Sequence, residues 1–202
     1  MTAEIIRLDP ANAEKAFSRC REVVRAGGVL VFPTETFYGL GVDPQNAEAV
    51  TRLFAIKKRN AGQPLLVLLP DAGQVSEWAA DVSTEARQLM KQYWPGPLTL
   101  VFKAHQRVLP SISGGTGTIG LRVTGNPVTR SLLRFIGTAL TGTSANISGG
   151  VNAITAEQAS SALGDVVDLI LDAGPTTGGK PSTVLDVRSR PFRIIRPGAI
   201  EF

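Results

Sequence analysis

The chain has 202 residues, 43% of them hydrophobic and 19% charged, and it carries a net charge of +4. This is ordinary globular composition, and the length predicts one domain over residues 1–202 that buries enough surface to fold without disulfide bonds. The single cysteine, Cys20, excludes an intramolecular disulfide. Because the chain also has only one histidine, His105, a zinc site is not expected either.

Two segments bear on where the protein resides. The N-terminal MTAEIIRLDP has no basic start followed by an apolar stretch, so it is unlike a signal peptide. The densest apolar run, LLVLL at residues 65–69, is far shorter than the ~20 residues that cross a bilayer. We therefore expect a cytoplasmic protein with no membrane partner. The positive net charge fits an anionic partner and, equally well, a slightly basic surface.

Strand and helix patterns alternate in the first half of the chain. Apolar runs predict strands at residues 5–8, 29–32 and 65–69, and amphipathic spacing predicts helices at residues 13–26, 47–58 and 84–93. Asn12 and Asn46 stand at the N-cap positions of the first two helices, and Gly27 with Gly28 ends the first.

The second half adds more strands than helices. Strands are predicted at residues 98–103, 120–123, 139–143, 169–171, 184–187 and 192–195, and helices at 127–136 and 156–163. Pro127 follows a capping asparagine, and Gly137 ends that helix. Because strands dominate the last third, we expect an α/β fold, a twisted mixed β-sheet with packed helices.

Three motifs suggest chemistry that their surroundings do not support. GPTTGGK at residues 174–180 matches the start of a phosphate-binding P-loop, but Pro181 replaces the hydroxyl residue and a strand pattern follows. A glycine-rich turn, from which Lys180 can still reach an anion, is the better interpretation. GGTG at residues 114–117 lacks dinucleotide-binding spacing and predicts a mobile loop. Ser144 as a nucleophile would need a base, and His105 lies in a polar segment without an orienting partner.

Basic side chains stand at the ends of several predicted elements. Lys57, Lys58 and Arg59 end a helix, Arg122 lies on a strand and Arg196 follows one. Each has an ordinary explanation, such as complementing a helix dipole or occupying an exposed strand face. Together with hydroxyl-rich loops they predict a pocket for a polyanion, with Arg59 as a two-pronged phosphate contact.

Six segments, taken together and in order, resemble the YrdC-like threonylcarbamoyl-AMP synthases of the TsaC type. They are FPTETFYGLG, AIKKR, TIGLRV, TSANISG, PSTVLDV and IIRPG, and they extend from about Gly28 to Gly198. The resemblance implies the YrdC-like α/β fold around a large basic concave site. It also implies the short form of the family, without the C-terminal domain of the long members.

The resemblance implies an activity as well. The enzyme would join L-threonine, bicarbonate and ATP, the last accompanied by Mg²⁺, into L-threonylcarbamoyladenylate and pyrophosphate. The product would serve N6-threonylcarbamoyladenosine synthesis in tRNA, completed by a separate transferase complex. Binding of structured RNA is a further property linked to the family. FPTETFYGLG would shape the threonine side of the pocket, where its glycines let the backbone approach the ligand.

Roles carry over residue by residue. Lys57 and Arg59 fall on the family's Lys-x-Arg, which faces the ATP phosphates, and they are the catalytic candidates. The threonine pocket would be formed by Thr34, Thr36, Leu68, Arg122 and Ser182, with Arg122 pairing with the carboxylate. The nucleotide would be contacted by Arg59, Gln63, Thr118, Gly142, Ser144, Asn146, Asn152 and Arg196.

Departures from the family pattern leave alternatives open. Many members have histidine where this chain has Leu68, and Asn-Pro where it has Gln63-Pro64. Because of Leu68, a related carbamoyl-adenylate enzyme that acts on another acceptor remains an alternative. An RNA-binding module without adenylation activity is a further alternative. Glu35 is a candidate for the base that takes the ammonium proton of threonine; the alternative is a buried structural acid.

Overall fold

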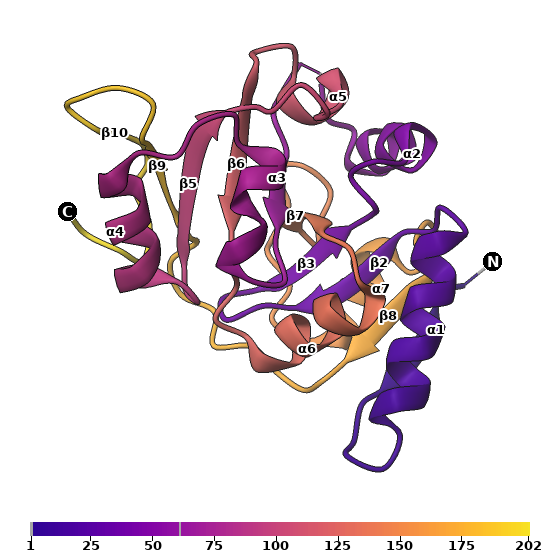
Figure 1. Cartoon of the computed structure of the whole chain (residues 1–202). Helices are drawn as coiled ribbons and strands as arrows, with labels where there is room; N and C mark the ends of the chain where they lie inside the picture. The colour runs from indigo at the N-terminus through magenta and orange to yellow at the C-terminus, as the bar shows by residue number, and fades with distance from the viewer. Residues whose placement is uncertain (1, 61) are drawn as a thin grey trace.

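A computed structural model describes residues 2–60 and 62–202. Over these residues the chain forms a ten-stranded sheet with helices packed against it (Figure 1). The strands are β1 (Glu4–Arg7), β2 (Leu30–Pro33), β3 (Tyr38–Gly41), β4 (Leu66–Leu68), β5 (Leu98–Lys103), β6 (Thr118–Arg122), β7 (Leu140–Ser144), β8 (Leu169–Asp172), β9 (Thr183–Asp186) and β10 (Arg193–Arg196).

The strand order is β1-β8-β2-β3-β7-β4-β6-β5-β9-β10. The pairs β1–β8, β2–β8, β4–β6 and β5–β9 are parallel, and the remaining pairs are antiparallel, so the sheet is mixed, as the sequence predicts. β7 joins the two halves, because Thr143 pairs with Leu40 of β3 and Thr141 pairs with Val67 of β4. The termini lie at opposite ends of the molecule (Figure 1).

The helices begin and end largely where the sequence predicts. They are α1 (Ala13–Arg25), α2 (Ala47–Lys57), the 3₁₀ turn η1 (Ala72–Gln74), α3 (Val75–Trp78), α4 (Thr84–Tyr93), α5 (Pro110–Ser113), α6 (Pro127–Ile136) and α7 (Ala156–Leu163). The side chains of Asn46, Ser83, Asn126 and Thr155 accept backbone N–H bonds at N-caps. Asn12 differs, because its Nδ2 donates to the Arg7 carbonyl instead.

Two hydrophobic clusters cover the two faces of the sheet. Alternate residues of one strand go to different clusters: Val31 of β2 packs with α2, whereas Phe32 packs with α1 and α6. Cys20 lies fully buried in the second cluster, and burial raises the pKa of its thiol to about 12. It is a core residue, as interpreted from the sequence.

Two elements depart from the sequence prediction. No strand is predicted at YGLG, which has two glycines, yet it forms β3 and pairs antiparallel with β2, which places residues 34–37 in a hairpin turn. The short helix α5 was also not predicted. By contrast, the segment 174–180 leads into β9 rather than a helix, with positive φ at Gly174, Gly178 and Gly179, so it is a turn and not a P-loop.

Within residues 2–60 and 62–202, no helix combines the length and the apolar composition that a membrane crossing requires.

Candidate active site

A cavity of about 710 Å³ opens where the β2–β3 hairpin, the loop after β7 and the strands β5, β6, β9 and β10 meet. Its volume is within the range of small-molecule sites. Every residue assigned from the sequence to threonine or nucleotide binding lines it. These residues are Thr34, Thr36, Lys57, Arg59, Gln63, Leu68, Thr118, Arg122, Gly142, Ser144, Asn146, Asn152, Ser182 and Arg196. What each of them binds stays a prediction.

Basic side chains from distant parts of the chain share this lining, and among the described residues no acidic side chain does. Lys57 comes from α2, Arg59 follows that helix, Arg122 lies on β6 and Arg196 on β10. Burial lowers the pKa of Arg59, and burial with the nearby charge of Arg122 lowers that of Arg196. Lys57 is buried and Arg59 half-buried, neither pairs with a carboxylate among the described residues, and cations in that position favour an anionic ligand, whereas Arg196 is more exposed.

Arg59 shows this most clearly. Its Nη2 donates to the Pro64 carbonyl at 2.9 Å. Its Nε is buried and has no hydrogen-bond partner in the described part of the chain. An unpaired buried donor on a charged group is costly, so a phosphate oxygen at this position would satisfy a group that the fold leaves unsatisfied.

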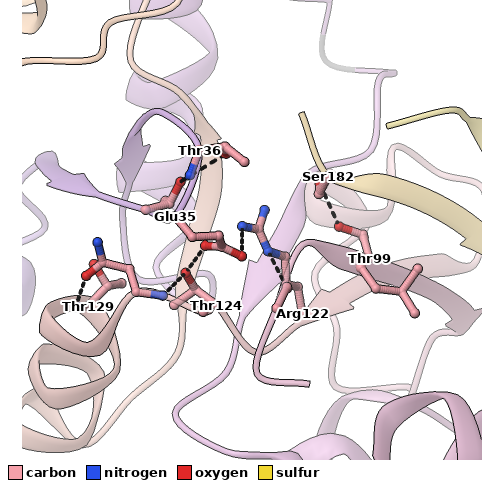
Figure 2. A network of polar contacts seen from close by, with 12 residues as sticks. Glu35, Thr36, Thr99, Arg122, Thr124, Thr129 and Ser182 are labelled. Carbon is pink, nitrogen blue, oxygen red and sulfur yellow. Dashed lines mark hydrogen bonds and ion pairs between the residues drawn. The ribbon is translucent and has the colours of Figure 1, made fainter. Parts of the chain in front are cut away.

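Arg122 differs, because Glu35 faces it (Figure 2). Nη2 of Arg122 lies 2.5 Å from Oε1 of Glu35, an ion pair in which neither atom makes a well-aligned hydrogen bond to another described residue. Arg122 Nε donates to the Gly96 carbonyl at 3.2 Å, and Thr124 Oγ1 donates to Oε2 of Glu35 at 2.5 Å. The guanidinium is thus held from two sides.

The same contacts bear on the two interpretations of Glu35. Burial alone would raise its pKa, but the charge of Arg122 and the hydrogen bond from Thr124 outweigh burial and hold the pKa below its usual value. A carboxylate with a lowered pKa is a poor proton acceptor. Glu35 therefore orients Arg122, which fits the interpretation as a structural acid better than that as a base.

Lys57 is directed at the loop after β7. Its Nζ donates to the carbonyls of Ser144 (2.6 Å) and Asn146 (2.8 Å) and to Oδ1 of Asn146 (2.8 Å). These three bonds use all three N–H groups of the ammonium. Burial, with the charge of Arg59, lowers the pKa of Lys57 to about 8. Lys57 thus organises the Ser-Ala-Asn loop, and its charge lies beside the cavity.

The Ser-Ala-Asn loop is closed by its own side chains. Ser144 Oγ donates to Asn146 Oδ1 at 2.7 Å. Nδ2 of Asn146 donates to the Gly150 carbonyl (2.6 Å) and to Oδ1 of Asn152 (3.2 Å). Because its hydroxyl donates to an amide oxygen, Ser144 is not arranged as an activated nucleophile.

A second polar corner joins β5, β9 and β10. Arg196 Nη2 donates to the Ser182 carbonyl (2.7 Å) and to its Oγ (3.1 Å). Figure 2 shows the contact on the other side, where Thr99 Oγ1 lies 3.2 Å from Ser182 Oγ. Thr99 lines the cavity and was missed from the sequence. Its signal was a polar residue within the apolar strand LTLVF, in the same alternation as Val101, which also lines the cavity.

The hairpin turn forms the opposite wall. Thr34 Oγ1 donates to the Phe37 carbonyl at 2.7 Å and accepts from the backbone N–H groups of Thr36 and Phe37, each at 3.2 Å. Hydroxyls that bond their own backbone close tight turns. The Thr34 and Thr36 oxygens lie 3.3 Å apart, and both residues are buried at the cavity wall.

Part of the wall is apolar. Leu68 of β4 is a register partner of Arg122 on β6, and both line the cavity. A Cβ atom added to Gly142 of β7 would lie 2.9 Å from Leu68 Cγ. The glycine therefore allows the close approach of β7 to this leucine, as expected where backbone must come near a side chain or a ligand.

Three residues considered from the sequence lie elsewhere. Lys180 forms an exposed ion pair with Glu201 at 2.9 Å. His105 Nδ1 accepts from the Arg107 backbone N–H at 3.3 Å in an exposed turn. Cys20 is in the core.

The fold and the cavity together define a mixed-sheet α/β protein with a large cavity whose lining includes Lys57, Arg59, Arg122 and Arg196. The family model Sua5_yciO_yrdC, described as telomere recombination, matches residues 22–198. The chain belongs to the Sua5/YciO/YrdC family.

Similar proteins were found both by sequence and among solved structures. A threonylcarbamoyl-AMP synthase of Thiobacillus denitrificans is 40% identical over 164 residues, which cover 81% of this chain and 87% of that one. The crystal structure of P. abyssi Sua5 complexed with L-threonine matches with a TM-score of 0.92 and 32% identity over 98% of this chain and 58% of that one. E. coli YciO matches with a TM-score of 0.88 and 29% identity over 100% and 98%. The chain thus spans little more than half of that Sua5 but nearly all of YciO.

Proposed function

We propose that this protein is an L-threonylcarbamoyladenylate synthase, which forms threonylcarbamoyl-AMP and pyrophosphate from L-threonine, bicarbonate and ATP. The observation that carries the proposal is the convergence of Arg59, Arg122 and Arg196 on one cavity. Their charges suit a triphosphate and a carboxylate, and the buried hydroxyls of Thr34 and Thr36 suit a small hydroxy amino acid. The relative named threonylcarbamoyl-AMP synthase and the threonine-bound Sua5 support it.

Carbamate formation comes first. Bicarbonate takes the ammonium proton of threonine and decomposes to CO₂ and water, and the free amine then adds to CO₂ with loss of its second proton to solvent. Among the described residues, the cavity lining offers neither carboxylate nor imidazole for this step. Arg122, held by Glu35 and Gly96, would fix the threonine carboxylate so that the amine faces the nucleotide.

Adenylation follows by displacement at phosphorus. A carbamate oxygen attacks the α-phosphorus of ATP, the bond to the β-phosphate oxygen breaks, and pyrophosphate leaves with the electron pair. The charge that develops on the phosphate oxygens would be stabilised by Arg59 and Arg196, and by the Ser-Ala-Asn loop that Lys57 holds. Mg²⁺ would enter with ATP as part of the substrate and be held mainly by phosphate oxygens and water. Among the described residues, the lining supplies hydroxyl and amide oxygens but no carboxylate to bind it.

The product is a mixed anhydride and must be passed to an acceptor. We propose that a separate transferase complex uses it to form N6-threonylcarbamoyladenosine in tRNA. Direct contact with tRNA or another structured RNA is a further proposal, to which the net charge of +4 gives general electrostatic support.

One assay separates the alternatives. The protein is incubated with ATP, Mg²⁺, bicarbonate and single amino acids, and pyrophosphate and the adenylate are measured, the latter by mass spectrometry. We expect product that depends on threonine. Product only with another substrate would indicate a different acceptor, and no product together with tight RNA binding would favour the RNA-binding alternative.

Arg59→Ala tests the phosphate site within that assay. We expect turnover to fall at least tenfold, about 1.4 kcal/mol of lost transition-state stabilisation. Lys58→Asn is the matched control, because Lys58 is exposed and has a φ of 48°, which asparagine tolerates. It removes a neighbouring charge and should leave turnover within about twofold, which is typical of an exposed charge. Unchanged kinetics in Arg59→Ala would exclude Arg59 from phosphate binding.

A further inference from the structure

The glycine-rich turn at residues 174–180 has no part in the reaction described above, yet it is fastened to the cavity wall. At its base, the buried Tyr38 donates from Oη to the Gly174 carbonyl at 2.7 Å. Further along, the Thr176 backbone N–H donates to the Ile154 carbonyl at 2.8 Å. The turn is thus fixed at two points before it reaches the β2–β3 hairpin.

Two hydrogen bonds then join the turn to the hairpin. Thr177 Oγ1 donates to the Glu35 carbonyl at 2.5 Å, and the Gly178 backbone N–H donates to the Thr36 carbonyl at 2.7 Å. Gly178 has a φ of +67°, a conformation that turns its N–H toward the hairpin at little cost for glycine. Segments more than a hundred residues apart in sequence are in this way clamped together.

The clamped hairpin turn carries three side chains of the cavity wall that is proposed to bind threonine. The hydroxyls of Thr34 and Thr36 line the cavity, and the side chain of Glu35, between them, holds Arg122. Fixing the carbonyls of Glu35 and Thr36 therefore fixes the directions of all three side chains. Thr177 itself lies outside the lining formed by the described residues, so its effect on a ligand is indirect.

We propose that Thr177 is a positioning residue for the amino-acid half of the cavity. It rests on the proposed function, because it assumes that the hairpin side of the cavity receives threonine. The nucleotide half is built on Lys57, Arg59 and the Ser-Ala-Asn loop, which make no contact with this turn among the described hydrogen bonds. Loss of the Thr177 hydroxyl should therefore weaken one substrate and spare the other.

The test compares Thr177→Val, which keeps the shape, with Thr177→Ser, which keeps the hydroxyl. Thr176→Val is the matched control, because Thr176 Oγ1 bonds to Ile154 rather than to the hairpin. In Thr177→Val we expect the KM for threonine to rise about fivefold, which corresponds to the net free energy of one hydrogen bond. The KM for ATP and kcat should stay within about twofold, Thr177→Ser should restore the threonine KM, and Thr176→Val should leave it unchanged.

A second measurement does not depend on activity. The N–H groups of Thr36 and Phe37 bond to Thr34 Oγ1 inside the clamped turn, so their hydrogen exchange should be faster in Thr177→Val than in the wild type. Should that variant fail to fold, Thr177→Ala removes the same hydroxyl and is judged by the same two measurements.

The outcomes are distinguishable. An unchanged threonine KM with unchanged exchange overturns the proposal, as does an equal rise in both KM values with a lowered Tm, which would mean a general structural role. If the wild type forms no threonine-dependent product, the proposed function fails instead, and the exchange of residues 34–38 alone decides whether Thr177 fixes the turn.

Discussion

Among single residues, Lys57 is a lysine whose charge changes close to neutral pH. Its pKa of about 8 lies below the 10.5 of an exposed lysine, so the folded protein loses this proton first as pH rises. Between these two pH values the unfolded chain holds more protons than the folded one. This group therefore makes the free energy of unfolding increase with pH over that window.

Nucleotide binding should respond in the opposite direction. Above about pH 8 the amine loses its charge and one of the three N–H groups that hold the Ser-Ala-Asn loop. We expect ATP affinity, measured by calorimetry, to fall by up to about 30-fold between pH 7 and 9.5, the factor by which the charged fraction of Lys57 decreases. The phosphates are already ionised in that range, so they contribute little to the slope. An affinity that stays constant to pH 9.5 would mean that nucleotide binding does not need the charged lysine.

At the scale of secondary structure, the contact between β4 and β7 limits what can stand at the cavity wall. A methyl group in Gly142→Ala would approach Leu68 Cγ to 2.9 Å and Leu66 Cδ1 to 3.3 Å. Overpacking of this kind costs about 1–3 kcal/mol. We expect a lower Tm and, because the strands are forced apart beside the cavity, a weaker threonine affinity.

The control for this substitution is the double variant Gly142→Ala with Leu68→Ala. Removing the Leu68 side chain takes away the two nearest atoms that the new methyl group meets and leaves the third, Leu66 Cδ1 at 3.3 Å, so the double variant should be less unstable than the sum of the two single changes. Strict additivity of the two free-energy changes would show that the clash is not the cause. Thermal unfolding of all four proteins completes the cycle.

The same scale shows what the sequence can and cannot predict. The helix predicted at about residues 84–93 and the strand predicted at 98–103 are confirmed as α4 and β5, because α4 has a clear helical pattern and β5 is a long apolar run bounded by turn residues. β3 was missed, since glycines weaken local strand preference and only pairing with β2 and β7 makes YGLG a strand.

The candidate site also has features that the sequence predicts and features that it does not. Motif resemblance located many of the residues that line the cavity, because the segments that carry the resemblance lie at its wall. It did not reveal that Lys57 bonds to the Ser-Ala-Asn loop, that Glu35 pairs with Arg122, or that Thr177 clamps the hairpin. These contacts join segments that are 87, 89 or 142 positions apart, and no local pattern encodes such distances.

For the whole molecule, the strand order places the cavity across both halves of the sheet. The hairpin wall belongs to β2 and β3, the opposite walls to β5, β6, β9 and β10, and β7 is the strand that joins them. A ligand that contacts both walls therefore adds a further link between the two halves of the sheet, which β7 and the Glu35–Arg122 ion pair already connect. Ligands that bind only the folded state stabilise it as a whole.

We accordingly expect L-threonine and a non-hydrolysable ATP analogue each to raise the Tm. At a concentration 100 times Kd the gain is about 2.7 kcal/mol, and with roughly 2–4 °C per kcal/mol for a chain of this size the shift should be about 5–10 °C. In Arg59→Ala the shift with the ATP analogue should fall to about half or less at the same concentration, because that guanidinium is assigned to phosphate and a tenfold weaker affinity removes about 1.4 kcal/mol, whereas the shift with threonine should persist. A full nucleotide shift in Arg59→Ala would place the nucleotide outside this cavity, and a lost threonine shift would mean that Arg59 supports the fold of the site rather than the phosphate.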